Sequence, residues 1–153
     1  FKMLRAYPEA GEPINLDTAA DAVLDCRPAI GILGRRTRRV FVGDNAAIAD
    51  FGLHVATICG DHTGTLSPAD LAAIEITTFL FKQTVFAGTA ASVMGNPLNA
   101  IVWLADRLSA NGRQLQANHI VATGSCTAIL QVWPGQHLAA DFGRLGQVEC
   151  IFG

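Results

Sequence analysis

Residues 97–111 carry the complete signature of a long helix, and this helix restricts the folds open to the chain more than any other segment does. Asn96 is placed to cap the first turn, Pro97 suits the first helical position, and Gly112 suits the turn that ends the helix. Apolar residues recur at helical spacing and predict one face that packs on a core: Ile101, Leu104, Ala105 and Leu108. The chain is therefore expected to build its core against this helix, and Trp103 is expected to belong to that core.

Short segments typical of strands lie on both sides of the helix. Residues 74–81 are rich in β-branched and aromatic side chains, and the pattern resumes at 84–86, which predicts a hairpin. Turn residues separate four further expected strands, at 119–122, 128–132, 137–142 and 147–152. Upstream we expect a helix over 17–24 capped by Asp17 or Thr18, a buried strand over 28–33, a turn at 43–45 and a strand over 53–59. This order predicts the α+β class rather than an alternating α/β sheet.

The composition excludes several classes of protein. Half of the 153 residues are hydrophobic and 16% are charged, which fits one well-buried or self-associating domain. The net charge of -2 provides no positive field for a phosphate backbone, so we expect no nucleic-acid partner. Apolar runs stop well short of the ~18 residues that a membrane span requires, so we expect no membrane partner either.

The cysteines indicate the cellular location of the protein, and the first residue indicates whether the chain is part of a longer one. Cys26, Cys59, Cys126 and Cys150 form no C-x-x-C pair, and no segment resembles a signal peptide. We therefore expect four free thiols and a cytoplasmic location. The chain begins at Phe1 rather than Met, and we expect it to be a piece of something longer.

Several separated motifs occur in a recognisable order. They are PAI at 28–30, DNA at 44–46, GNPLNAIVWLA at 95–105, TGS at 123–125, PG at 134–135 and FGRLGQV at 142–148. Together they resemble the C-terminal part of the 2-keto-4-pentenoate hydratase and 4-oxalocrotonate decarboxylase family, within the fumarylacetoacetate hydrolase superfamily. The resemblance covers essentially the whole chain. It implies a single domain over 1–153 that lacks an N-terminal segment, with a mixed β-sheet rolled on itself and one long packed helix.

The resemblance also implies residues that contact a substrate. Asn45 and Ser125 match pocket positions of the family, with Thr127 and Arg36 as weaker candidates for carboxylate contact. An amide in a loop can orient a carboxylate or enol oxygen, and a hydroxyl can donate or accept a hydrogen bond. Each residue also has an ordinary structural explanation: a turn at 44–45, a strand-end turn at 124–125, and a solvated connection for the arginines at 35–39.

A divalent metal, magnesium or manganese, is part of the chemistry that the resemblance implies. Family members hold it with three carboxylates, which suit such hard cations. Two of them form a Glu-x-Glu segment immediately before the residue that matches Phe1, and this chain contains no such segment. Gly31 stands where the third ligand is expected, Gly34 replaces a second acidic residue, and Ala47 replaces a frequent serine. We therefore expect that this chain alone does not bind the metal.

Three functions remain open at this point. The first is a hydratase- or decarboxylase-like lyase acting on a 2-oxo (2-hydroxydienoic) acid in the catabolism of aromatic ring-cleavage products. The second is a non-catalytic or repurposed homologue that stabilises a partner subunit or binds a different ligand. The third is a metal-independent reaction that uses Asp44, His54 or Cys126 as acid or base. In each case we expect a homo-oligomer, or a hetero-oligomer with a homologous subunit.

Overall fold

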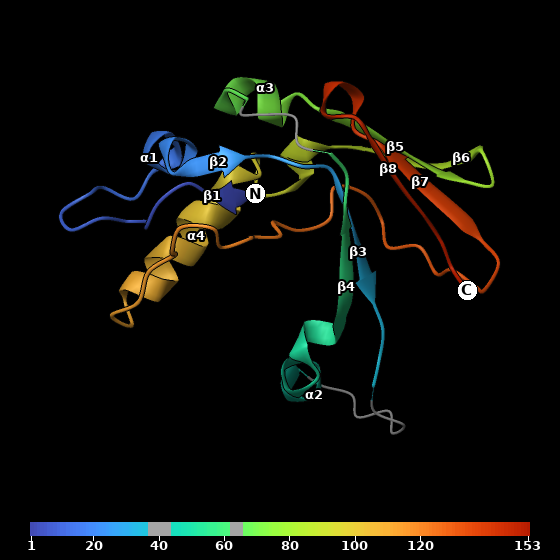
Figure 1. Ribbon diagram of the computed structural model, residues 1–153, viewed down its shortest axis with the longest axis horizontal. Helices are drawn as coiled ribbons and strands as arrows, with labels where there is room; N and C mark the ends of the chain where they lie inside the picture. Colours follow the sequence, from blue (N-terminus) through green and yellow to red (C-terminus); the bar gives the residue numbers. More distant parts are fainter. Residues whose placement is uncertain (37–43, 62–65) are drawn as a thin grey trace.

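A computed structural model describes residues 1–36, 44–61 and 66–153 of the chain. Its elements, in chain order, are β1 (Lys2–Met3), α1 (Leu16–Asp21), β2 (Val23–Asp25), β3 (Ala29–Leu33), α2 (Asp44–Ala49), η1 (Phe51–Leu53), β4 (His54–Cys59), α3 (Pro68–Ala72), β5 (Glu75–Leu80), β6 (Gln83–Thr89), η2 (Ala90–Ser92), α4 (Leu98–Ser109), β7 (His137–Asp141), η3 (Gly143–Leu145) and β8 (Gln147–Ile151). Figure 1 shows three parts: α1, β1, β2 and α4 on one side, the β5–β8 sheet on the other, and the β3–β4 hairpin projecting between them.

The long helix forms where the sequence predicts it. The Asn96 side chain accepts a hydrogen bond from the Leu98 N–H (3.0 Å) and donates one to the Pro68 carbonyl (2.7 Å). This buried amide therefore caps α4 and ties its start to α3. Leu98, Ile101 and Ala105 are the residues of α4 that are buried, which confirms the expected apolar face.

The shorter helix α1 begins at a different cap from the one predicted. Asn15 and Thr18 form a reciprocal capping box, in which each side chain accepts a hydrogen bond from the backbone N–H of the other residue. Asp17 lies in the first helical turn, and the helix ends at Asp21 because the chain continues into β2. The predicted N-cap, Asp17 or Thr18, thus lies two or three residues after the observed one. The sequence did not decide the position because Asn15, Asp17 and Thr18 all have side chains that can cap a helix.

The four-stranded sheet has the order β6–β5–β7–β8, and every pairing of the described strands is antiparallel. The predicted hairpin and the last two predicted strands are confirmed. The sheet differs from the mixed sheet that the sequence suggested, because short turns join β5 to β6 and β7 to β8, and short turns join antiparallel strands. The strands predicted at 119–122 and 128–132 do not form, and within them only Ile120 makes an isolated bridge, to Lys2.

The β3–β4 hairpin, with α2 and η1 at its far end, forms an arm (Figure 1). The sequence predicted a buried strand at 28–33, but exposed and half-buried residues alternate along β3, and none is fully buried. The apolar run forms a strand as expected, yet the described parts of the chain place no covering layer on it. The turn predicted at 43–45 is also wrong where the structure describes it, because Asp44 and Asn45 begin α2; Gly43 lies outside the described residues.

One hydrophobic cluster connects the body of the molecule, from Met3 near the start to Leu145 near the end. Tyr7 is completely buried in it, with its hydroxyl 3.0 Å from Thr18 Oγ1 and 3.2 Å from the Asn15 carbonyl oxygen. The first strand, α1 and α4 are thereby packed together. None of the helices in the described ranges has the length and apolar composition of a membrane span.

Candidate functional site

The start of the chain and the segment that carries Ser125 lie side by side. The Phe1 amino group donates a hydrogen bond to the Val121 carbonyl (2.9 Å), and the Val121 N–H donates to the Phe1 carbonyl (2.8 Å). Met3 and His119 continue the pairing, with the Met3 N–H 2.9 Å from the His119 carbonyl oxygen. The loop 121–127 therefore starts from a fixed position beside Phe1.

A glycine in β6 sets the path of this loop. A Cβ atom on Gly88 would lie 2.1 Å from the Cys126 carbonyl oxygen and 3.2 Å from Thr127 Cγ2. The loop can thus cross the sheet at this point only because Gly88 has no side chain. Gly124, with a φ of +122°, supplies the bend just before Ser125. The position of the TGS motif is therefore defined by two glycines, one local and one distant in sequence.

The two hydroxyls of the loop bond within the loop itself. Ser125 Oγ donates to the Thr127 carbonyl (2.7 Å), and Thr127 Oγ1 donates to the Ala128 carbonyl (3.3 Å). Ser125 is exposed and Thr127 is half-buried. The Ser125 hydroxyl can accept a further hydrogen bond, or turn toward an anion, without any loss of buried contacts.

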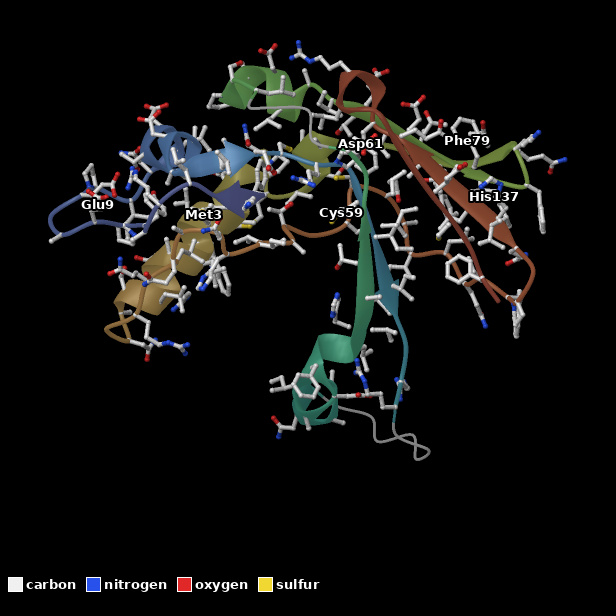
Figure 2. All side chains as sticks on the ribbon, viewed as in Figure 1. Met3, Glu9, Cys59, Asp61, Phe79 and His137 are labelled. Atoms are coloured by element: carbon white, nitrogen blue, oxygen red, sulfur yellow. The ribbon has the colours of Figure 1, made fainter. Side chains whose placement is uncertain are left out.

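Acidic and thiol groups gather near Phe1 where β2 ends and the arm begins. Asp25 is buried and forms a two-point ion pair with Arg27, at 3.1 and 3.2 Å. Phe1 and Cys26 line the same small pocket, and Cys59 is the last residue of β4. Figure 2 shows Cys59 and Asp61 at the junction between the arm and the body. This junction and the loop 121–127 form the candidate site.

Burial disfavours the charged form of two thiols of the site, Cys26 and Cys126. Burial raises the pKa of Cys26 to about 11 and also raises the pKa of Cys126. A protonated thiol is a poor nucleophile and a poor base. The structure therefore gives no support to Cys126 as a base, and none of the four cysteines, all of them described, forms a disulfide.

The predicted substrate contacts fall into two groups. Ser125 and Thr127 lie together on the loop, whereas Arg36 follows β3 and Asn45 is an exposed residue of α2, both on the arm. The guanidinium of Arg36 donates to Asp50 Oδ1 (3.0 Å) and to the His54 carbonyl. Arg36 is therefore already engaged in holding the arm. Arg38 and Arg39, from the same charge run, lie outside the described residues.

Gly31 lies in the middle of β3, opposite Thr57 of β4. A Cβ atom at Gly31 would meet nothing within 4 Å, and its φ is not positive. Neither packing nor backbone conformation requires a glycine here. There is thus space at this position for a larger side chain, such as the carboxylate that the family resemblance implies here.

The described residues contain no complete ligand set for a divalent metal ion. Over residues 1–36, 44–61 and 66–153, no three His, Cys, Asp or Glu side chains come together in a way that could hold an ion. Asp25, the buried carboxylate nearest to the candidate site, is paired with Arg27. The described residues therefore do not fit a resident metal ion.

The structure also shows residues that the sequence reasoning missed. Gly88 has a signal that could have been used, because a glycine inside an alternating strand pattern indicates close approach of another backbone. Asp50 has no motif around it that would single it out, yet it is buried and accepts from both the backbone and the side chain of Arg36.

Trp103 is not a core residue. It is 52% exposed, and the Arg107 guanidinium lies 5.7 Å from its ring centroid. It borders an open hollow of about 360 Å³ whose lining is Ile14, Met94, Asn99, Val102, Trp103 and Asp106. The prediction failed because Trp103 lies between the buried Ile101 and Ala105 in sequence but on the outer side of the helix.

Curated relatives match most of this chain. It is 34% identical over 111 residues to a 2-keto-4-pentenoate hydratase of Burkholderia vietnamiensis, a match that covers 72% of the chain and 40% of the relative. It is 31% identical over 122 residues to a 2-oxo-hept-4-ene-1,7-dioate hydratase of Escherichia coli, with 77% and 43% covered. A 4-oxalocrotonate decarboxylase of Pseudomonas putida is 25% identical over 145 residues, with 95% and 55% covered. The chain spans about half the length of these relatives. No protein-family model matches the sequence.

Solved structures show the same fold. The 4-oxalocrotonate decarboxylase of Pseudomonas putida G7, complexed with magnesium and adipate, superposes with a TM-score of 0.88 at 23% identity and covers 99% of this chain and 57% of its own. The same enzyme with calcium and acetate gives a TM-score of 0.84 at 22% identity. At this level of identity the similarity establishes the fold.

Proposed function

Because the chain belongs to the family of 2-keto-4-pentenoate hydratases and 4-oxalocrotonate decarboxylases, we propose that it forms part of a lyase acting on a small 2-oxo acid. The expected reaction is hydration or decarboxylation of a 2-hydroxydienoic acid from aromatic ring cleavage. The observation that carries the proposal is the agreement among the relatives, which are hydratases or a decarboxylase and match 72–95% of this chain. That agreement favours the lyase over a homologue that only stabilises a partner.

The loop 121–127 is the surface that we propose for the substrate. Its Ser125 hydroxyl is exposed, and the loop is fixed by Gly88 and by the Phe1–Val121 pairing. A rigid support with an exposed hydroxyl can orient a carboxylate or an enol oxygen without a large entropic cost. The solved relatives are complexed with adipate and acetate, both carboxylates, which supports this class of ligand.

Thr127, Asn45 and Arg36 are proposed as secondary contacts. Thr127 Oγ1 makes a long bond of 3.3 Å to its neighbour's carbonyl, which a ligand oxygen can replace. Arg36 can contact a ligand only with the N–H groups that Asp50 and His54 leave, so its contribution is expected to be smaller than that of Ser125. Asn45 contributes only if the substrate reaches the arm.

Magnesium or manganese is the cofactor that we propose for the family reaction, where it would stabilise a developing enolate. The relatives complexed with magnesium and with calcium support a divalent ion in the family. The described residues provide no group of three ligands for it. We therefore propose that this chain does not hold the ion by itself, and that carboxylates beyond the described residues complete the site.

We also propose that residues 1–153 form one domain of the fumarylacetoacetate hydrolase C-terminal type, with a sheet rolled on itself and α4 packed against it. The single hydrophobic cluster from Met3 to Leu145 supports one domain. The absence of a disulfide among the four described cysteines is compatible with the reducing cytoplasm.

Turnover by the full-length protein tests the proposed function. With Mg²⁺ or Mn²⁺ and a 2-hydroxydienoic acid, the ultraviolet absorbance of the dienol is expected to fall. The Ser125→Ala variant is expected to lose roughly tenfold to a hundredfold in kcat/KM, the value of a hydrogen bond to a charged group. Ser109→Ala, at the exposed end of α4, is the control and should retain full activity. Absence of turnover, or equal activity of the two variants, would contradict the proposal.

A further inference from the structure

Lys2 in β1 has an ammonium group that no other residue of the described chain engages. Within residues 1–36, 44–61 and 66–153 it forms neither an ion pair nor a side-chain hydrogen bond, although the residue is partly buried. Lysine normally buries its apolar stem and leaves its ammonium to water or to a carboxylate. The charged end of Lys2 is therefore available to an anion.

The strand register places the Lys2 side chain on the face of the β1–β2 pair that points away from the core. Its neighbours in sequence point inward, because Met3 is completely buried and Phe1 lines a small pocket with core residues. Successive residues of a strand point to opposite faces, so Lys2 points outward. It lies opposite Asp25 on one side and Ile120 on the other, and opposed side chains of antiparallel strands share a face.

This outer face is open beside the candidate site. Ile120, the residue directly before the loop 121–127, is 73% exposed, so the face is uncovered on that side of Lys2. Neighbouring strands lie about 4.8 Å apart, which puts the Lys2 backbone one strand spacing from the segment that leads into the loop. Figure 1 shows β1 and the start of the chain beside β2, where the arm begins. The Lys2 ammonium is thus close enough to contact a ligand that extends from the loop along β1.

The other charges on this face leave the charge of Lys2 unbalanced. The Arg27 guanidinium donates through Nε and Nη2 to the two oxygens of the buried Asp25 carboxylate, at 3.2 and 3.1 Å, so these two charges offset each other. Asp61, a second carboxylate near Arg27, is exposed, and water and salt screen its charge. Lys2 therefore adds a positive charge that attracts a carboxylate.

We infer that Lys2 binds a second carboxylate of the substrate, so that the ligand of this site is a 2-oxo dicarboxylic acid rather than a 2-oxo monocarboxylic acid. The inference rests on the proposed function, which places the 2-oxo acid end at the loop 121–127. The far carboxylate then extends along the outer face of β1 to the Lys2 ammonium. A monocarboxylic acid of the same length would put a methyl group beside that ammonium and would gain no ion pair. Lys2 is thus a specificity-determining residue.

Calorimetric titration of the full-length protein with 2-oxohexanedioate and with 2-oxohexanoate, both in the presence of Mg²⁺, tests the inference. The two ligands have the same number of carbons and differ only at the far end. The unmodified protein is expected to bind the dicarboxylate roughly tenfold more tightly, the value of one hydrogen bond to a charged group. In Lys2→Met, which keeps a long apolar side chain, this preference is expected to fall to about twofold or less, while the affinity for 2-oxohexanoate stays the same.

Lys82→Met is the matched control, because Lys82 is the other lysine of the chain and is exposed in the turn between β5 and β6. This variant is expected to keep the full preference for the dicarboxylate. Equal affinities of the unmodified protein for the two ligands, or an equal loss for both ligands in Lys2→Met, would overturn the inference and leave the proposed function intact. Absence of binding by both ligands would overturn the proposed function and, with it, the inference.

Discussion

Two glycines of this chain have opposite roles at the residue scale. Gly88 allows the Cys126 carbonyl to cross β6, whereas Gly31 faces open space. We expect Gly88→Ala to destabilise the fold by about 1–3 kcal/mol because a methyl group would overpack the crossing. Gly31→Ala is the control and should be neutral or stabilise by roughly 0.4–1 kcal/mol, because it only reduces the freedom of the unfolded chain. Urea unfolding of both variants measures the difference, and equal stabilities would contradict the assigned roles.

The Arg36–Asp50 pair is the residue-scale contact that responds to pH. The Arg36 backbone N–H, and then its side chain, lower the pKa of Asp50 below 3.8. A carboxyl with a depressed pKa adds stability that is fully present above its unfolded value and is lost as pH falls through the folded value. We therefore expect the arm to lose stability below about pH 4. Hydrogen exchange of the β4 amides against pH checks this.

Arg36→Gln provides the matching substitution. It is expected to lower the melting temperature and to leave the Asp50 carboxylate, whose side chain is 4% exposed, without its cation. Arg144→Gln removes an arginine from the pair with Asp70, in which both side chains are about half exposed, and should change stability by less than about 0.5 kcal/mol. Equal losses in the two variants would show that the Asp50 pair has no special structural role.

At the scale of elements, the start of α4 depends on one buried amide. Asn96 both caps Leu98 and donates to the Pro68 carbonyl, so it connects α3 with α4. Asn96→Ala is expected to cost about 1–2 kcal/mol of unfolding free energy. Asn111→Ala, at the exposed C-terminal end of the same helix, should stay within about 0.5 kcal/mol. Chemical denaturation measures both, and a neutral Asn96 variant would contradict the proposed link.

Elements with local signals were predicted from the sequence, and elements that depend on distant partners were not. The helix α4 has its own cap and apolar face, and β5–β6 and β7–β8 are joined by short turns. Residues 128–132 have an apolar pattern but pair with no strand, because they follow the crossing at Gly88, which sequence proximity cannot reveal. The apolar pattern of β3 predicted a strand correctly, but burial depends on what covers it.

The same limit applies to the candidate site. Ser125 was found through a motif, and its neighbours Thr127 and Gly124 come with it in sequence. The contacts that position its loop are long-range, because Val121 pairs with Phe1 and Cys126 approaches Gly88, at separations of more than 35 residues. Arg36 was predicted as a weaker candidate for carboxylate contact from the family resemblance, and its ion pair with Asp50 could not be predicted because the two residues are 14 positions apart.

At the scale of the whole molecule, the loop 121–127 beside Phe1 is the surface that we propose for a small carboxylic acid. The hollow beside Trp103 has no role in this proposal. Ligand binding at the loop is the central claim, because the proposed lyase function requires it.

Amide chemical shifts of the isotopically labelled chain, titrated with a 2-oxo acid such as 2-oxopentanoate, test that claim most directly. We predict saturable shifts for residues 121–127 and for residues 25–27 at the adjacent junction, with weaker binding by Ser125→Ala. Shifts confined to the hollow beside Trp103, or no shifts with millimolar ligand, would contradict the claim.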